Sequence, residues 1–131
     1  MSGELSLEKI LKDLCPVLLE ESYVFCSLPQ GQYGTLPSLS PLASVQEPEG
    51  LTLVLTTGEA AREDLSFEGT FRCIRLEVYS SLESVGLTAT VSTALAKEGI
   101  SANLIAGAHH DHVLVPSPRA EQALKVLRNL G

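Results

Sequence analysis

The most conspicuous chemical cluster in the sequence is the run His109-His110-Asp111-His112. Imidazole and carboxylate groups can ligate a metal ion, and a turn could bring two of the imidazoles together. The run has no further ligands at metal-site spacing, and the three cysteines lie far from it in the sequence. A polar hairpin turn is therefore the favoured interpretation. A metal-binding module is the minor alternative, which loss of His109 and His112 would test through metal content.

No constellation typical of catalysis accompanies this cluster. The sequence lacks a Gly-rich phosphate loop, a GxSxG elbow and an HExxH pair. Cysteine and histidine can together form a nucleophilic pair, but nothing in the sequence orients one toward the other. We therefore predict a protein that is not an enzyme and that uses no cofactor and no metal.

A second polar segment spans residues 80–86, which read Ser-Ser-Leu-Glu-Ser-Val-Gly. A strand precedes it over residues 71–79, where apolar and charged side chains alternate. An amphipathic helix follows it and ends at Gly99, which suits the left-handed position after a helix. Ser80 and Glu83 have the spacing of a capping box. For these two side chains, a capping role competes with contact to a ligand.

The elements that position these segments follow from hydrophobic periodicity and from turn residues. Pro, Gly, Ser and Gln dominate residues 29–41, which are predicted to form an irregular loop. Thr56 and Glu59 form a second candidate capping box, and Ser117 is expected to cap the last helix. The patterns predict helices over residues 6–14, 56–65, 87–98 and 117–130, and strands over residues 22–28, 42–46, 51–55, 71–79, 100–106 and 112–115.

The order of these elements indicates an α+β fold of two related halves. From residue 71 the order is β-α-β-β-α, a ferredoxin-like unit that lacks its final strand. Residues 22–66 supply a second incomplete unit, and similar strand-to-cap sequences lie 60 residues apart at Leu53–Thr57 and Val113–Ser117. We predict an N-terminal half over residues 1–68 and a C-terminal half over residues 69–131, which exchange a strand. A missing strand supplied by a second chain is the open alternative.

Charge and cysteine usage limit the partners. With 9 basic and 16 acidic residues the formal charge is −7, which disfavours nucleic acid and anionic membrane surfaces. Cys15, Cys26 and Cys73 are odd in number and widely spaced, as expected for reduced thiols in a cytoplasmic protein. We expect neither export nor membrane insertion, because no basic leader and no apolar run of ~20 residues is present.

The stretch from Val85-Gly86-Leu87 to Gly99-Ile100 resembles the signature of ACT domains, which are small regulatory modules. It has the Gly-Leu pair at the start of a helix, the Leu/Ala-rich helix and the turn Ala96-Lys97-Glu98-Gly99-Ile100. The whole chain is similar to small stand-alone tandem-ACT proteins of bacteria, to the ACT pairs of aspartokinases and to amino-acid sensors of the CASTOR type. It departs from the usual Asp/Asn-x-Pro-Gly, because Glu83-Ser84-Val85-Gly86 stands there.

The resemblance implies a tandem ferredoxin-like fold, with antiparallel sheets and helices on one face, and a site at this loop. The positive end of the helix dipole suits a ligand carboxylate, Gly86 permits close approach of the backbone, and Glu83 can accept the ligand's ammonium. Asn103, on the adjacent strand, offers both a donor and an acceptor. The ligand-binding residues so predicted are Ser81, Glu83, Ser84, Val85, Gly86, Leu87, Asn103, Ile105 and Ala106.

The function that the resemblance implies is that of an amino-acid sensor. Its expected partners are an amino acid or a similar small molecule, a second copy of the chain in a homodimer, and an enzyme, transporter or regulator that receives the signal. The alternative is a protein–protein interaction module without a functional ligand pocket.

Overall fold

The computed structural model describes residues 3–131, which form two compact units. Unit 1 comprises the N-terminal residues through Glu20 together with Arg72–Gly131, and unit 2 comprises Glu21–Phe71. Strand β1, Pro16–Pro29, contributes residues to both. The division of the chain at residues 68 and 69, and the exchange of a strand between the halves, stay predictions.

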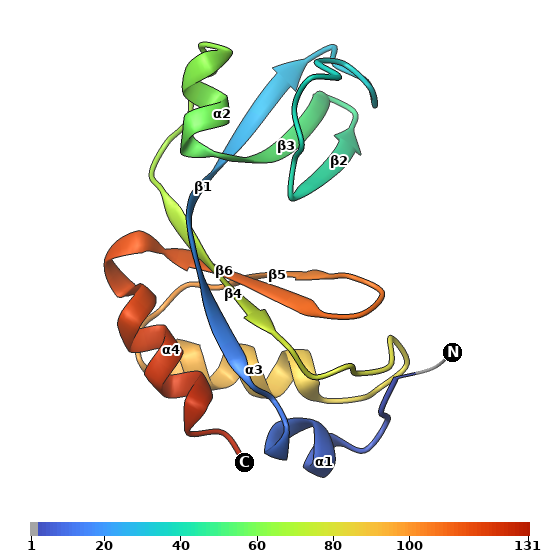
Figure 1. The fold of residues 1–131 in the computed structure, drawn as a ribbon, viewed down its shortest axis with the longest axis vertical. Helices are drawn as coiled ribbons and strands as arrows, with labels where there is room; N and C mark the ends of the chain where they lie inside the picture. The colour runs from blue at the N-terminus through green and yellow to red at the C-terminus, as the bar shows by residue number, and fades with distance from the viewer. Residues whose placement is uncertain (1–2) are drawn as a thin grey trace. The chain divides into compact units, whose positions relative to one another are not determined.

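Unit 1 is a sheet with its helices on one face (Figure 1). Its strand order is β1-β4-β6-β5, with β5 at the edge. Besides β1 it contains α1 (Leu7–Lys12), β4 (Phe71–Leu76), α3 (Leu87–Lys97), β5 (Asn103–Ala106), β6 (Asp111–Pro116), the 3₁₀ turn η1 (Ser117–Arg119) and α4 (Ala120–Arg128).

The core of unit 1 lies between the sheet and its three helices. Ile74 and Leu76 of β4, Leu95 of α3 and Leu127 of α4 are fully buried there. Because the apolar stripe of α3 predicted from the sequence is the face that packs, its side chains fix how the first turn of α3 is presented.

Unit 2 contains an antiparallel sheet of order β2-β3-β1. It is built from the second part of β1, β2 (Ala43–Glu47), β3 (Gly50–Thr56) and helix α2 (Thr57–Arg62). The capping box predicted at Thr56 and Glu59 is confirmed, because both of its reciprocal hydrogen bonds are present. Residues 30–42 contain no helix or strand and lie between β1 and β2 (Figure 1); the irregular loop was predicted over residues 29–41.

Several predicted element boundaries are wrong. Strand β5 begins at Asn103 instead of residue 100, and helix α2 ends at Arg62 instead of residue 65. Strand β1 begins at Pro16 instead of residue 22, because its first residues pair in unit 1 and its later ones in unit 2. Strand β4 ends at Leu76, before the residues expected to complete it. The last helix begins with η1, and α4 has Arg119 as its N-cap instead of Ser117.

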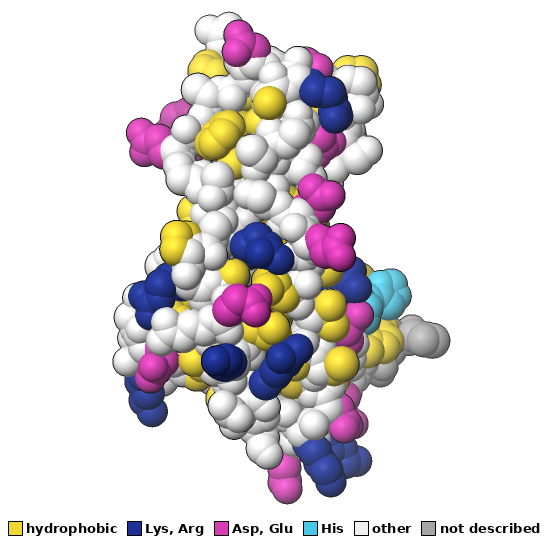
Figure 2. All heavy atoms as spheres, turned by 60° about the vertical axis from the view of Figure 1, so that its left-hand side comes forward, with side chains coloured by type: hydrophobic (Ala, Val, Ile, Leu, Met, Phe, Trp, Pro, Cys, Tyr) yellow, Lys and Arg dark blue, Asp and Glu magenta, His cyan; other side chains and the backbone are white. Residues whose placement is uncertain are grey.

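The surface carries mixed charge. On the face drawn in Figure 2, basic, acidic and hydrophobic side chains are interspersed, without a continuous basic surface. Within residues 3–131, none of the helices has the length and apolar character needed to cross a bilayer.

Candidate functional site

The loop that joins β4 to α3 ends in a glycine whose backbone only glycine adopts at low cost. Gly86 is the N-cap of α3 and has φ +105°, in the left-handed region that L-residues avoid. Thr90 N–H donates to the Gly86 carbonyl at 2.8 Å and so closes the first helical turn. Since Gly86 has no side chain, it cannot cap the N–H groups of that turn itself.

Residues 80–86 form the site loop. Hydrogen bonds to the N-terminal segment of the chain fix the first residues of this loop. Glu4 N–H donates to the Tyr79 carbonyl at 2.8 Å, and Ser81 N–H donates to the Glu4 carbonyl at 2.8 Å. Within the loop, Ser81 Oγ accepts from Glu83 N–H at 3.1 Å, and the Ser81 carbonyl accepts from Ser84 N–H at 3.0 Å. These bonds hold the loop in a defined conformation in front of α3.

A hydrogen bond from the other side joins the site loop to the β5–β6 hairpin. Ser80 Oγ donates to Asp111 Oδ2 at 3.2 Å, and only 8% of Ser80 is exposed. Asp111 lies at the start of β6, after a turn closed by the bond from Gly107 N–H to the His110 carbonyl at 2.9 Å. The predicted polar turn therefore delivers one of its own side chains to the loop.

These elements surround a cavity of about 550 Å³ within unit 1. Its walls come from the site loop, the first turn of α3, and the β5–β6 turn. The residues that line it are Ser80, Ser81, Leu82, Ser84, Val85, Gly86, Leu87, Thr88, Ala89, Ala106, Gly107 and Asp111.

Most of the predicted ligand-binding residues line this cavity, and three do not. Ser81, Ser84, Val85, Gly86, Leu87 and Ala106 are in the lining. Glu83 lines a neighbouring hollow together with Tyr79 and His109. Asn103 and Ile105 line neither. The capping box considered for Ser80 and Glu83 does not form, since Gly86 is the N-cap of α3.

Six lining residues were not predicted from the sequence: Ser80, Leu82, Thr88, Ala89, Gly107 and Asp111. Thr88 and Ala89 follow from the helix start, because the first turn of a helix points its N–H groups at whatever precedes it. The sequence singled out Asp111 only as a member of the histidine-rich turn. That pattern does not indicate the direction in which the Asp111 carboxylate points.

The electrostatics of the cavity are two-sided. The N-terminal end of α3 supplies a partial positive charge and has no acidic residue in its first turn. Among the described residues that line the cavity, Asp111 is the one with a charged side chain. The cavity therefore presents backbone donors at one wall and a carboxylate at another.

The histidines of the turn lie beside this cavity. The His109 ring stacks at a tilt on Tyr79, with ring centroids 5.4 Å apart, and His110 Nδ1 is buried without a partner among the described residues.

The Glu77 carboxylate accepts two hydrogen bonds from Arg75, which lower its pKa, and the nearby His110 and His112 lower it further. In residues 3–131 no group of three or more His, Cys, Asp or Glu side chains is arranged to hold a metal ion.

Comparison with known families identifies the class of protein that this fold and site define. Residues 2–72 match an ACT domain family, and residues 68–129 match another ACT domain family. The chain belongs to the ACT domain family and consists of two tandem ACT domains, so the predicted resemblance and fold class are confirmed. ACT domains are regulatory modules that typically bind small molecules, and they are not catalytic.

Solved structures agree with this assignment. A protein of unknown function from Vibrio cholerae, described as a possible transport protein, is 46% identical, with 92% of each chain covered and a TM-score of 0.83. The ligand-free regulatory subunit of aspartate kinase from Thermus thermophilus is 14% identical over 88% of this chain and 95% of that one, with a TM-score of 0.62. Escherichia coli aspartokinase III in complex with aspartate and ADP is 14% identical over 86% of this chain and 32% of that one, with a TM-score of 0.65. The two aspartokinase likenesses show the fold alone. No match exists among curated proteins.

Proposed function

We propose that this protein is a regulatory module that binds a free α-amino acid in the cavity between the site loop and the β5–β6 turn. The observation that carries the proposal is the placement of the α3 N-terminus and the Asp111 carboxylate around one cavity. An α-amino acid carries a carboxylate and an ammonium on neighbouring atoms, so both of its charges have a partner there.

Each end of such a ligand has a physical reason to bind. Its carboxylate accepts from the N–H groups of Leu87, Thr88 and Ala89, which lie in the first turn of α3 and have no carbonyl partner inside the helix. Its ammonium donates to Asp111, whose Oδ2 is already held by Ser80. Hydroxyls of Ser81 and Ser84 add donors and acceptors at the rim. ACT domains typically bind small molecules, and this property of the family supports the assignment.

The test is thermal unfolding of the purified protein against each of the twenty amino acids. A ligand present at 100 times its dissociation constant adds about 2.7 kcal/mol to the free energy of unfolding. We expect a selective rise in Tm for one or a few amino acids. No rise with any of the twenty would contradict the proposal and favour an interaction module without a functional pocket.

Variants locate the site. Asp111→Asn removes the charge that meets the ammonium, and Gly86→Asp places a negative side chain at the helix start, so both should weaken the selected amino acid at least tenfold. Asn103→Ala reports on the predicted strand contact, which the cavity lining does not include. Glu121→Gln, in the first turn of α4, is the control with the same charge change as Asp111→Asn and should leave affinity unchanged.

A regulatory module must pass on the occupancy of its cavity through a surface that contacts another chain. Two exposed residues of the site loop are candidates for such a contact. Leu82 and Val85 are 70% and 83% exposed, and both line the cavity. We propose that they contact a second copy in a homodimer and so couple occupancy of the cavity to association. Sedimentation equilibrium of Leu82→Ser with Val85→Ser should then show a monomer, whereas Leu5→Ser, another exposed aliphatic position, should not change the assembly.

The output partner would be an enzyme, a transporter or a regulator, and the description of the Vibrio cholerae relative as a possible transport protein favours the second of these. The proposed location is the cytoplasm, and three free cysteines are consistent with it, because thiols stay reduced there.

A further inference from the structure

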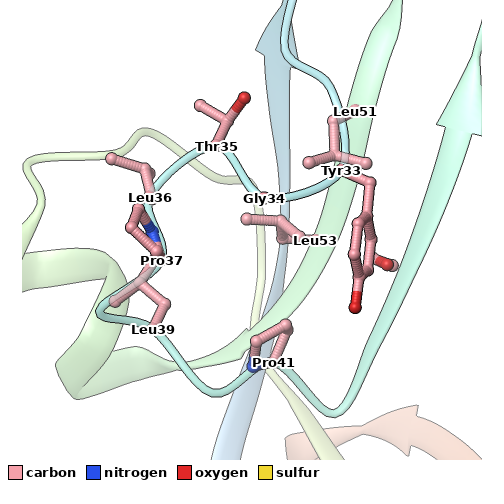
Figure 3. A pocket seen from close by; sticks show the side chains of 10 residues that line it. Tyr33, Gly34, Thr35, Leu36, Pro37, Leu39, Pro41, Leu51 and Leu53 are labelled. Atoms are coloured by element: carbon pink, nitrogen blue, oxygen red, sulfur yellow. The ribbon is translucent and has the colours of Figure 1, made fainter.

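Unit 2 covers one face of its sheet with an irregular loop. Leu51, Leu53 and Leu55 alternate along β3 and are all buried. The helix that packs on β3, α2, has six residues. Residues 30–42, called the cover loop here, lie over Leu51 and Leu53 instead (Figure 3).

The cover loop is fixed to the rest of unit 2 at three points. Gln46 Nε2 donates to the Gly31 carbonyl at 2.9 Å. Ser40 N–H donates to Glu59 Oε2 at 2.9 Å. Leu42 N–H donates to the Val54 carbonyl at 2.8 Å. Since β2, α2 and β3 each hold part of the loop, its shape is set before any ligand arrives.

One leucine of the cover loop adopts a strained backbone. Leu36 has φ +60°, which costs a residue with a Cβ about 1–2 kcal/mol. Figure 3 shows Leu36, Pro37 and Leu39 along one side of an open space, with Tyr33 on the other side and Pro41 at its lower end. Strained backbone conformations are commonly found at ligand-binding sites, where the strain contributes to function.

The space between them is a pocket of about 280 Å³ whose chemistry differs from that of the site-loop cavity. Leucine, proline and tyrosine side chains form most of its lining, and none of the described lining residues is charged. Its polar side-chain atoms are the hydroxyls of Tyr33, Thr35 and Ser44. Tyr33 is 88% exposed, so its ring has much surface left to bury against an occupant.

We propose that this pocket binds a small, neutral, mainly apolar molecule of one or two rings. An apolar cavity of about 150 Å³ accepts benzene in another protein, so this pocket is of a size for a slightly larger ring system. A zwitterionic amino acid is excluded, because its charges would lose hydration and meet no charged side chain. The pocket is thus a second ligand site, chemically distinct from the one in unit 1.

Indole is a suitable probe, because the chain contains no tryptophan and the fluorescence of the probe can be read selectively. We expect saturable binding of indole to the full-length protein. Ser44→Phe fills the pocket from β2 and should weaken indole more than tenfold. Val45→Phe is the matched control, since adjacent residues of a strand point to opposite faces; Val45 is exposed and is not in the lining, so affinity should stay unchanged.

Tyr33→Ala tests the wall without touching the core and should weaken indole about tenfold. Equal affinity of wild type and Ser44→Phe would overturn the proposal, as would equal binding of indole and of the indole-3-acetate anion. If Tyr33→Ala turned a wild-type dimer into a monomer, the pocket would be an interface between copies, and the proposal would again be overturned.

Discussion

The hydroxyl of Ser80 donates to the carboxylate of Asp111 across 3.2 Å and joins segments that lie 31 residues apart in the sequence. Ser80 is the first residue of the site loop and Asp111 is the first residue of β6, so this hydrogen bond connects two walls of the unit 1 cavity. A hydrogen bond to a carboxylate is stronger than one between neutral groups. The stability of the loop and the geometry of the cavity therefore depend on the same contact.

Ser80→Ala should destabilise unit 1 by about 1 kcal/mol, because a buried hydroxyl that bonds a half-exposed carboxylate is lost. The measurement is chemical denaturation, combined with hydrogen exchange at the Ser81 amide, which we expect to speed up. Ser101→Ala, at an exposed position, is the control and should stay within about 0.5 kcal/mol of wild type. Unchanged stability and exchange in Ser80→Ala would show that the bond does not hold the loop.

Gly86→Ala should cost about 1–2 kcal/mol, because alanine is strained at φ +105°. The added Cβ would lie 2.9 Å from Leu7 Cδ2, the end of a flexible side chain, so backbone strain is the main term. Gly58→Ala is the matched control. It has free space for a Cβ and lies in α2, so it should stabilise by about 0.4–1 kcal/mol. Opposite signs for the two variants in urea denaturation would support the argument, and equal losses would contradict it.

The sequence predicted those parts of the fold that local chemistry determines. The Thr56–Glu59 capping box formed as its spacing indicated. Gly99 ended α3 at φ +70°, as a glycine after a helix commonly does. Such features depend on residues three or four apart, so a single sequence contains them.

Features that depend on pairing between distant segments were predicted less well. Asp111 could not be placed in the cavity from the sequence, because its direction depends on how the β5–β6 hairpin meets the site loop. Asn103 was expected at the site, but it lies on the edge strand β5, where it pairs with Leu114 of β6, and it does not line the cavity. The start of β1 at Pro16 was not predicted from the sequence, because the first residues of this strand belong to unit 1 and the later ones to unit 2.

The three cysteines should differ sharply in reactivity toward iodoacetamide at neutral pH. Burial raises the pKa of Cys73 to about 11 and also raises the pKa of Cys26, so both thiols stay protonated and enclosed. Cys15 is exposed. Because the thiolate is the reactive form, we expect one rapid modification per chain, and mass spectrometry should locate it at Cys15.

Denaturant provides the control for this labelling, since unfolding should make all three thiols react at similar rates. Cys15→Ser should remove the rapid phase while leaving the slow ones. Rapid labelling of Cys73 in the folded protein would contradict its burial in the core.

The Glu59 carboxylate should make the stability of unit 2 depend on pH. Burial raises its pKa, but hydrogen bonds from Ser40 N–H and from Thr56 outweigh burial, and the pKa of the folded state lies below the usual 4.5. The folded state then binds fewer protons than the unfolded one. The stabilisation is therefore complete above the unfolded pKa and is lost as pH falls from about 5 through the lowered pKa.

Glu59→Gln separates charge from capping, because glutamine can still accept in a capping box. We expect wild type to exceed this variant in unfolding free energy at pH 7 and the difference to shrink toward zero as the pH falls below 4.5. Glu59→Ala should lose about 1 kcal/mol more than Glu59→Gln, since it removes the cap as well. Glu68→Gln, at an exposed position, controls for net charge. Because Glu59 also fixes Ser40 of the cover loop, Glu59→Ala should weaken indole while Glu68→Gln should not; undiminished indole binding in Glu59→Ala would show that the loop keeps its shape without this anchor.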